Sequence, residues 1–142
     1  MKPTLAWIIA AWVAHCGSGV AEVTKPAHAD ARYSEEDFLP IESKAVSPGS
    51  VQSRRLDAAG LPAFFLVGDD PLSRTWLKRN IIRLTKLNAV GLVVNVRSKT
   101  ALENLRQIAP QLTLSPVAAD DLAQRLNLDH YPVLITADSV EQ

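Results

Sequence analysis

The sequence predicts an α/β domain over residues 60–142, in which four strands alternate with three helices in the order β-α-β-α-β-α-β. Short, uninterrupted apolar runs recur along this region, as is typical of strands buried on both faces. Between them lie segments with apolar residues at helical spacing. The alternation of the two patterns favours helices packed on a mostly parallel sheet. Apolar residues make up 47% of the 142-residue chain, which is enough for one such core.

The first strand is predicted over residues 62–68, where the run from Pro62 to Gly68 is apolar. Asp69 and Asp70 end this strand, and an aspartate there can cap the next helix, because Pro71 suits a first helical turn. The helix is predicted over residues 72–87. Its apolar face comprises Trp76, Leu77, Ile81, Leu84 and Leu87. Its other face carries Arg74, Lys78, Arg79, Arg83 and Lys86, with Ile82 among them.

The second strand and the second helix follow in the same alternation. Residues 89–96 form another continuous apolar run, which predicts a buried strand. Thr100 and Glu103 have the spacing of a capping box, so they predict a helix from residue 100 to residue 108. Pro110 ends it, because proline cannot continue a helix.

The last three elements complete the predicted domain. Residues 112–117 alternate between apolar and polar and predict a short strand. Asp120 and Asp121 place negative charge at the start of a helix over residues 120–126, where the helix dipole favours it. Residues 132–136 predict the final strand, directly after His130 and Tyr131.

The N-terminus has the pattern of a secretory signal peptide over residues 1–21. Lys2 precedes an apolar run of ten residues, and the small residues Gly19 and Ala21 flank the expected cleavage point. The run is shorter than the roughly 18 to 20 apolar residues of a membrane-spanning helix, so no integral span is expected after cleavage. The predicted location is therefore the periplasm. An uncleaved anchor is the alternative.

Cys16 raises a second alternative, a lipoprotein acylated at this residue. His15 stands where a small residue is expected, so we favour cleavage after Ala21. The mature chain would then contain no cysteine, and it would keep only His28 and His130. Thiol chemistry is excluded for such a chain, and no metal or other cofactor is expected.

Residues 22–59 differ in composition from the domain that follows. They are rich in Ala, Ser, Pro and charged residues, and show no sustained apolar period. Residues 38–41 form the only apolar cluster, and residues 47–50 are typical of a turn. We therefore expect a poorly ordered linker or arm that orders on a partner.

Several classes of function are disfavoured by what the sequence lacks. Fifteen basic residues balance fifteen acidic ones, so no direct contact with nucleic acid is expected. No glycine-rich phosphate loop follows a predicted strand, and no Gly-x-Ser-x-Gly turn is present. Asp69 and Asp70 could bind a divalent cation, but helix capping explains them better. Asp70, Ser73 and His130 could form a catalytic triad, although such common residue types also occur together by chance.

The basic side of the helix over residues 72–87 leaves a further alternative open. Five cations and no acidic residue occur between Arg74 and Lys86. Such a face could contact phosphates, anionic lipid or an acidic protein, and an ordinary solvated helix face explains it as well.

The segment from Leu122 to Ile135 resembles the region around the cis-proline of thioredoxin-like domains. Both have a helix, a short turn, a proline and an apolar strand in this order. The resemblance implies a thioredoxin-like fold with a cis bond between Tyr131 and Pro132. The redox dithiol of that fold would follow the first strand, where this chain has residues 69–74 and no cysteine.

A broader resemblance covers the region from Pro62 to the C-terminus. Four sequence blocks carry it, at residues 67–77, 89–96, 120–123 and 130–136, together with the terminal Glu141-Gln142. In order and spacing these blocks are similar to the small exported proteins of integrating conjugative elements, which are encoded with type IV secretion genes. The resemblance implies an envelope component of conjugative DNA transfer with no assigned enzymatic activity.

We therefore expect a non-catalytic periplasmic protein that assists a type IV secretion or conjugation apparatus through contacts with its other proteins. Without cysteines, the surface that thioredoxin-like domains use for substrate is available as an interaction patch. Its candidate residues are Asp69, Asp70, Ser73, Arg74, His130, Tyr131 and Pro132. The alternative is an envelope enzyme or an anion-binding protein that uses Asp70, Ser73 and His130.

Overall fold

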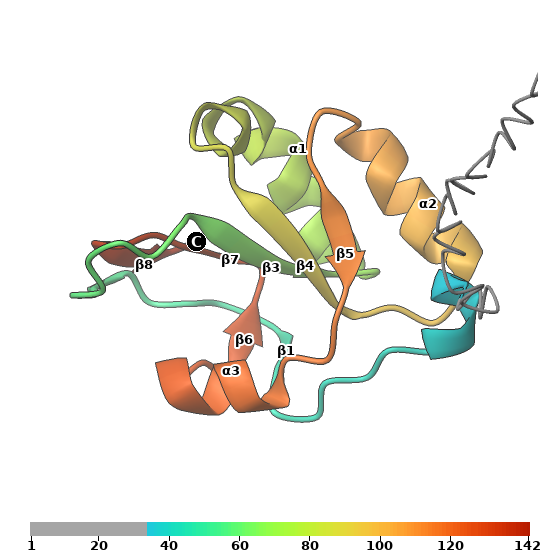
Figure 1. Cartoon of the computed structure of the whole chain (residues 1–142), viewed down its shortest axis with the longest axis horizontal. Helices are drawn as coiled ribbons and strands as arrows, with labels where there is room; N and C mark the ends of the chain where they lie inside the picture. Colours follow the sequence, from blue (N-terminus) through green and yellow to red (C-terminus); the bar gives the residue numbers. More distant parts are fainter. Residues whose placement is uncertain (1–33) are drawn as a thin grey trace, which may run out of the picture. The chain divides into compact units, whose positions relative to one another are not determined.

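The computed structural model describes residues 34–142, which form a mixed α/β unit around a six-stranded sheet (Figure 1). The strand order in this sheet is β2-β8-β7-β3-β4-β5, and β1 pairs separately with β6. The elements are η1 (Glu35–Phe38), β1 (Ser47–Pro48), β2 (Arg54–Arg55), β3 (Phe64–Gly68), α1 (Pro71–Lys86), β4 (Val90–Asn95), α2 (Lys99–Ile108), β5 (Leu114–Pro116), α3 (Asp120–Leu126), β6 (His130–Tyr131), β7 (Val133–Ile135) and β8 (Ser139–Glu141).

The sheet is mixed, so the prediction of a mostly parallel sheet was wrong. β3, β4 and β5 are parallel, whereas β7 and β8 run antiparallel to their neighbours. The reason is the path of the chain between β5 and β7. The short helix α3 is followed by β6, which pairs with β1, and Tyr131 of β6 lies beside the ends of β3 and β4, so the chain is not returned to the far end of the sheet. The chain therefore enters β7 beside the carboxyl end of β3, where Val133 pairs with Leu66.

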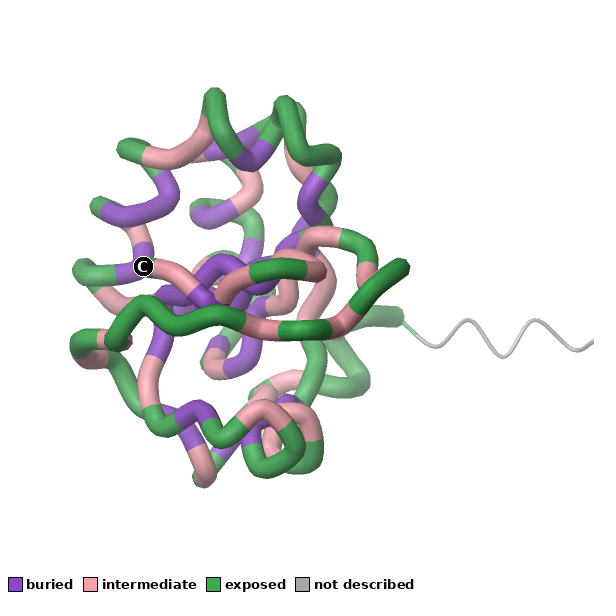
Figure 2. Tube along the Cα trace, turned by 90° about the vertical axis from the view of Figure 1, so that its left-hand side faces the viewer, coloured by how far each residue is buried: buried purple, intermediate pink, exposed green. Residues whose placement is uncertain are grey.

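Two apolar cores lie on opposite faces of the sheet, because successive side chains of a strand point to opposite sides. Phe65 and Val67 of β3 face α1 and α2, where they pack with Trp76 and Leu102. Leu66 between them belongs to the other core, which includes Ala123 of α3. Figure 2 shows the buried segments crossing the centre of the molecule between these layers. The predicted helices and central strands are thus confirmed, and Trp76 lies in the core as expected.

The expected disorder of the arm is wrong for residues 34–59. Ile41 forms a bridge with Val96, and Val46 is only 4% exposed. β1 and β2 pair with β6 and β8, respectively. The arm's apolar residues pack on both cores: Leu39 and Ile41 on the side of α1 and α2, and Val46, Val51 and Leu56 on the side of α3. Residues 22–33 of the predicted arm, the predicted signal peptide and Cys16 lie outside the described residues.

Three local details differ from the predictions. Ser98, not Thr100, caps α2, and its hydroxyl accepts a hydrogen bond from the Ala101 N–H. Leu87 lies just beyond α1 and is exposed rather than part of its apolar face. β8 was not predicted, because it has only three residues and one of them is buried. No helix within residues 34–142 has the length and hydropathy needed to cross a membrane.

Candidate functional site

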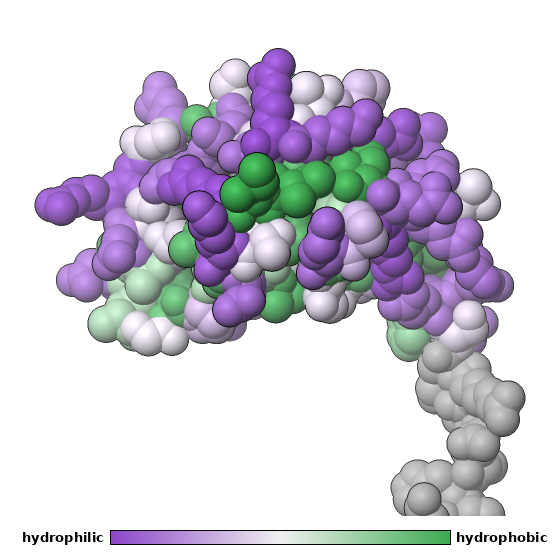
Figure 3. All heavy atoms as spheres, turned by 90° about the horizontal axis from the view of Figure 1, so that it is seen from above, coloured by the Kyte–Doolittle hydropathy of each residue, from purple (hydrophilic) through white to green (hydrophobic). Residues whose placement is uncertain are grey.

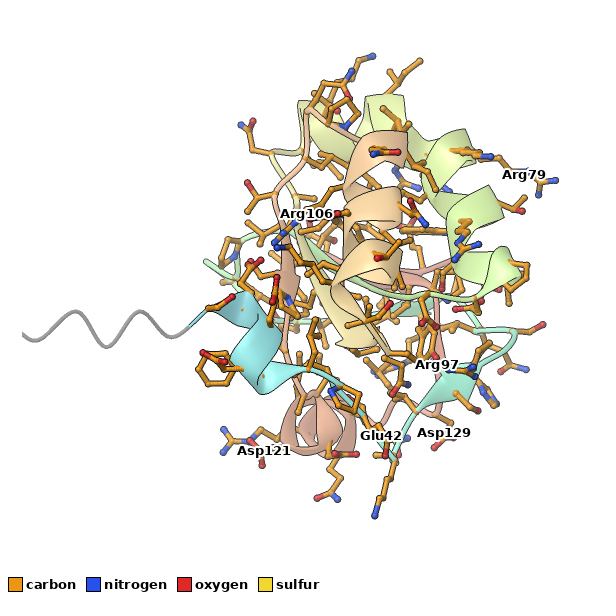
Figure 4. All side chains as sticks on the ribbon, turned by 90° about the vertical axis from the view of Figure 1, so that its right-hand side faces the viewer. Glu42, Arg79, Arg97, Arg106, Asp121 and Asp129 are labelled. Carbon is orange, nitrogen blue, oxygen red and sulfur yellow. The ribbon has the colours of Figure 1, made fainter. Side chains whose placement is uncertain are left out.

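A polar groove lies between the ends of β3 and β4 on one side and the arm on the other. Its volume is about 360 Å³. Asp69, Asp70, Asn95 and Tyr131 contribute to one wall, while residues 40–44 and Pro48 of the arm contribute to the other. Glu42 and Arg97, both labelled in Figure 4, are exposed and line the same groove. The arm therefore forms part of the candidate site, which the sequence did not indicate.

Asp70 is the N-cap of α1, as predicted. One carboxylate oxygen accepts a hydrogen bond from the Ser73 N–H at 2.9 Å, and the other accepts one from the Ser73 hydroxyl at 2.7 Å. The Ser73 oxygen in turn accepts a hydrogen bond from the Gly68 N–H at 3.0 Å. Ser73 is completely buried. Its hydroxyl therefore connects the end of β3 to the helix cap and is not exposed to a substrate.

Asp69 has a different role at the same turn. Its backbone N–H donates to the Asn95 carbonyl at 3.0 Å, and its carboxylate accepts a hydrogen bond from the Arg97 N–H at 3.2 Å. Both bonds join the turn after β3 to the end of β4. Because Asp69 and Asp70 already accept hydrogen bonds from protein groups, their arrangement supports a structural role. Among residues 34–142 no group of three or more His, Cys, Asp or Glu side chains could hold a metal ion.

Asn95 is a site residue that the sequence analysis missed. Its side-chain oxygen accepts a hydrogen bond from the Ser43 N–H at 2.7 Å, and its amide nitrogen donates to the Tyr131 hydroxyl at 3.1 Å. In the sequence, Asn95 is a single polar residue near the end of an otherwise apolar run, Val93-Val94-Asn95-Val96, and this pattern could have indicated a role for it. Asn95 is partly buried at a strand end, where a polar side chain needs hydrogen-bond partners.

Tyr131 lies against the end of β3 in this groove. A Cβ atom added at Gly68 would lie 2.6 Å from Cε2 of the Tyr131 ring, so glycine is what permits this close packing. Burial raises the pKa of the Tyr131 phenol, and the carboxylates of Asp70 and Asp69 raise it further. The hydrogen bond from Asn95 acts in the opposite direction. The Tyr131 phenol therefore keeps its proton to a higher pH than an ordinary tyrosine does.

His130 belongs to a different surface. Its Nδ1 atom lies 3.2 Å from both the hydroxyl and the carbonyl oxygen of Ser47, and its ring covers Gly49. It lines a second cavity of about 360 Å³ together with Asp129 and Arg54. Asp70 is thus hydrogen-bonded to Ser73, whereas His130 is hydrogen-bonded to Ser47 of the arm. These three residues therefore do not form a catalytic triad.

The two remaining residues of the predicted patch are largely enclosed by protein. Pro132 is buried, and its peptide bond with Tyr131 is cis, as the resemblance to thioredoxin-like domains implied. Its carbonyl accepts a hydrogen bond from the Gln142 side chain at 3.0 Å. Arg74 is half-buried, and its Nε has no hydrogen-bond partner. Of the predicted patch, Asp69, Asp70 and Tyr131 line the groove, and the exposed residues of the arm extend it.

The chain matches the model of a known protein family. A protein family described as "Protein of unknown function (DUF2859)" matches residues 17–140, which is most of the chain. No curated protein and no solved structure matches the chain. The match begins before the described residues and includes both the arm and the domain, in agreement with the packing of residues 34–59 on the sheet.

Proposed function

The chain belongs to the DUF2859 family, and we propose that it is a non-catalytic periplasmic component of an integrating conjugative element. In this proposal it assists a type IV secretion or conjugation apparatus by binding another of its proteins in the polar groove. The signal-peptide pattern of residues 1–21 supports export. The four sequence blocks between residues 67 and 136 support the assignment to conjugation.

The observation that carries the proposal is that the candidate catalytic side chains at the groove, Ser73 and Asp70, already make hydrogen bonds within the protein. The Ser73 hydroxyl is buried and makes two hydrogen bonds, while Asp70 caps α1. Neither group is placed as a nucleophile or a general base. The exposed charged groups of the groove are instead Glu42, Lys44 and Arg97, which carry both signs of charge. Such a surface suits a polar segment of a protein partner better than a reacting substrate.

We further propose a thioredoxin-like arrangement for the sheet and its helices. In support, cis Pro132 precedes β7, which runs antiparallel to β3, and α1 follows β3 where the redox dithiol would lie. One departure is the edge strand β5, which comes from between α2 and α3. The groove then occupies the place of the redox site, and protein binding replaces thiol exchange.

Site-specific cross-linking in cells that carry the element tests the function. A photoreactive amino acid at Lys44, in the groove, is expected to capture another protein encoded by the element. The same group at Gln124, which is exposed on α3, serves as the control. In parallel, Glu42→Lys and Arg97→Glu should lower the frequency of DNA transfer at unchanged thermal stability. Normal transfer after deletion of the gene, or purification of the protein from the cytoplasm alone, would contradict the proposal.

A further inference from the structure

The solvent-facing side of α1 concentrates positive charge. Its basic face comprises the exposed Lys78, Arg79, Arg83 and Lys86, with the half-buried Arg74 at its edge, and the helix contains no acidic residue. At about 100° per residue, these five cations cover roughly half of the helix circumference. The whole chain has a formal net charge of zero, so the acidic residues that balance this face lie elsewhere in the sequence.

Most of this charge is not neutralised by neighbouring carboxylates. Arg83 pairs with Glu141. Within residues 34–142, no carboxylate lies within ion-pair distance of Lys78, Arg79 or Lys86. The cations of α2 and α3 differ in this respect, because Lys99 pairs with Glu36, Arg106 with Glu35 and Arg125 with Asp121. Uncompensated positive charge on the helices is thus concentrated on α1.

An exposed aliphatic side chain lies in the middle of these cations. Ile82 is 73% exposed, more than the other large apolar residues on the surface of the described part. It is three or four residues from Lys78, Arg79 and Lys86, so the cations are its neighbours on the helix surface. Leu72 is 46% exposed near the start of α1. Figure 3, a view from above onto the helix layer, shows an apolar patch bordered by hydrophilic side chains.

The opposite side of α1 holds the helix in place. Trp76, Leu77 and Leu84 are buried against the sheet, and Phe65 and Trp76 have ring centroids 5.9 Å apart. The exposure of Ile82 is therefore a fixed feature of the fold and does not come from a loosely packed helix.

The chemistry of this face selects its partner. A stable protein interface buries about 800 Å² per partner around an apolar core. Ile82 and Leu72, ten residues apart on a convex helix, do not supply such a core. Binding to a bilayer surface requires less apolar area, because cations bind lipid phosphates while a few aliphatic groups enter the headgroup boundary. We propose that the basic face of α1, with Ile82 at its centre, docks the protein on a membrane surface rich in anionic phospholipid.

Vesicle binding tests this proposal with the mature chain, residues 22–142, which lacks the apolar run of the predicted signal peptide. Each Lys or Arg near an anionic surface contributes about a fivefold change in affinity, so three unpaired cations predict about 100-fold stronger partition onto phosphatidylglycerol vesicles than onto phosphatidylcholine vesicles. The double variant Lys78→Gln/Arg79→Gln should lose about 25-fold on phosphatidylglycerol. Raising the salt concentration to about 1 M should also abolish the difference between the two lipids.

The matched control neutralises two cations elsewhere. Arg55→Gln/Arg125→Gln removes the same charge from β2 and α3, and should change the partition by no more than about twofold. Ile82→Ser should weaken binding on phosphatidylglycerol, whereas Val117→Ser, at another exposed apolar residue, should not. Equal partition onto both lipids, or equal losses in the two double variants, would overturn the proposal. Binding to soluble polyglutamate without binding to vesicles would assign the face to an acidic protein and also overturn it.

Discussion

The side-chain amide of Asn95 donates a hydrogen bond to the phenolic oxygen of Tyr131 across 3.1 Å. Asn95 ends β4, and Tyr131 directly precedes the cis-proline before β7. The oxygen of the same amide accepts the Ser43 N–H of the arm at 2.7 Å. One side chain thus joins three segments that are distant in the sequence, and these segments line the groove together with Asp69 and Asp70.

Replacing Asn95 should therefore destabilise the protein. Asn95→Ala leaves the Ser43 N–H without its partner, and we expect a loss of about 1–3 kcal/mol in the free energy of unfolding. Urea unfolding followed by circular dichroism measures it. Asn104→Ala is the matched control, because Asn104 is exposed on α2, and its effect should stay within about 0.5 kcal/mol. Similar losses at the two positions would contradict the role assigned to Asn95.

Tyr131 should titrate later than an ordinary tyrosine. Burial is the main cause of its raised pKa, and Asp70 and Asp69 add to it. Because the folded state keeps the phenolic proton at a pH where the unfolded chain loses it, this stabilisation is complete below about pH 10 and is lost as the pH rises through the folded pKa. Absorbance at 295 nm, compared between the wild type and Tyr131→Phe, isolates its ionisation. Asp70→Asn should shift that ionisation to lower pH.

Asp70 should prove important for stability rather than for chemistry. Asp70→Ala removes the cap of α1 and should cost about 0.5–2 kcal/mol. Asp70→Asn should cost less, since asparagine caps a helix about as well. Thermal unfolding and DNA-transfer frequency, measured on both variants, separate the two roles. If both variants lost transfer equally while keeping full stability, a metal-binding or catalytic carboxylate would be indicated instead.

The predictable parts of the fold are those encoded by local patterns. Continuous apolar runs marked β3 and β4, and the Asp70-Pro71 pair marked the start of α1, because burial and capping depend on neighbouring residues. The direction of β7 was not predictable in this way. The direction of β7 depends on the path that the chain takes through α3 and β6, and no local sequence pattern encodes this path.

The groove was only half predictable for the same reason. Asp69, Asp70 and Tyr131 were found because they adjoin recognisable strand ends. Asn95 and the arm were missed, because their roles come from hydrogen bonds between residues about fifty positions apart, as between Ser43 and Asn95. The prediction that His130 belongs to the same patch was wrong. Its neighbour Tyr131 reaches the groove, whereas the His130 ring packs over Gly49. Adjacent residues of a strand point to opposite sides, and the sequence alone does not say which side holds the site.

Ser43 provides the sharpest test that the arm is part of the domain. It is buried, its hydroxyl donates to the Val94 carbonyl at 2.7 Å, and its oxygen accepts the Ala119 N–H at 2.9 Å. Ser43→Ala leaves both backbone groups buried without this partner, so unfolding should become easier by about 1–3 kcal/mol. Ser53→Ala, at an exposed arm position, should change stability by less than about 0.5 kcal/mol. A linker that orders only on a partner would show no effect for either substitution in the isolated protein, whereas the packing of the arm requires a loss for Ser43 alone.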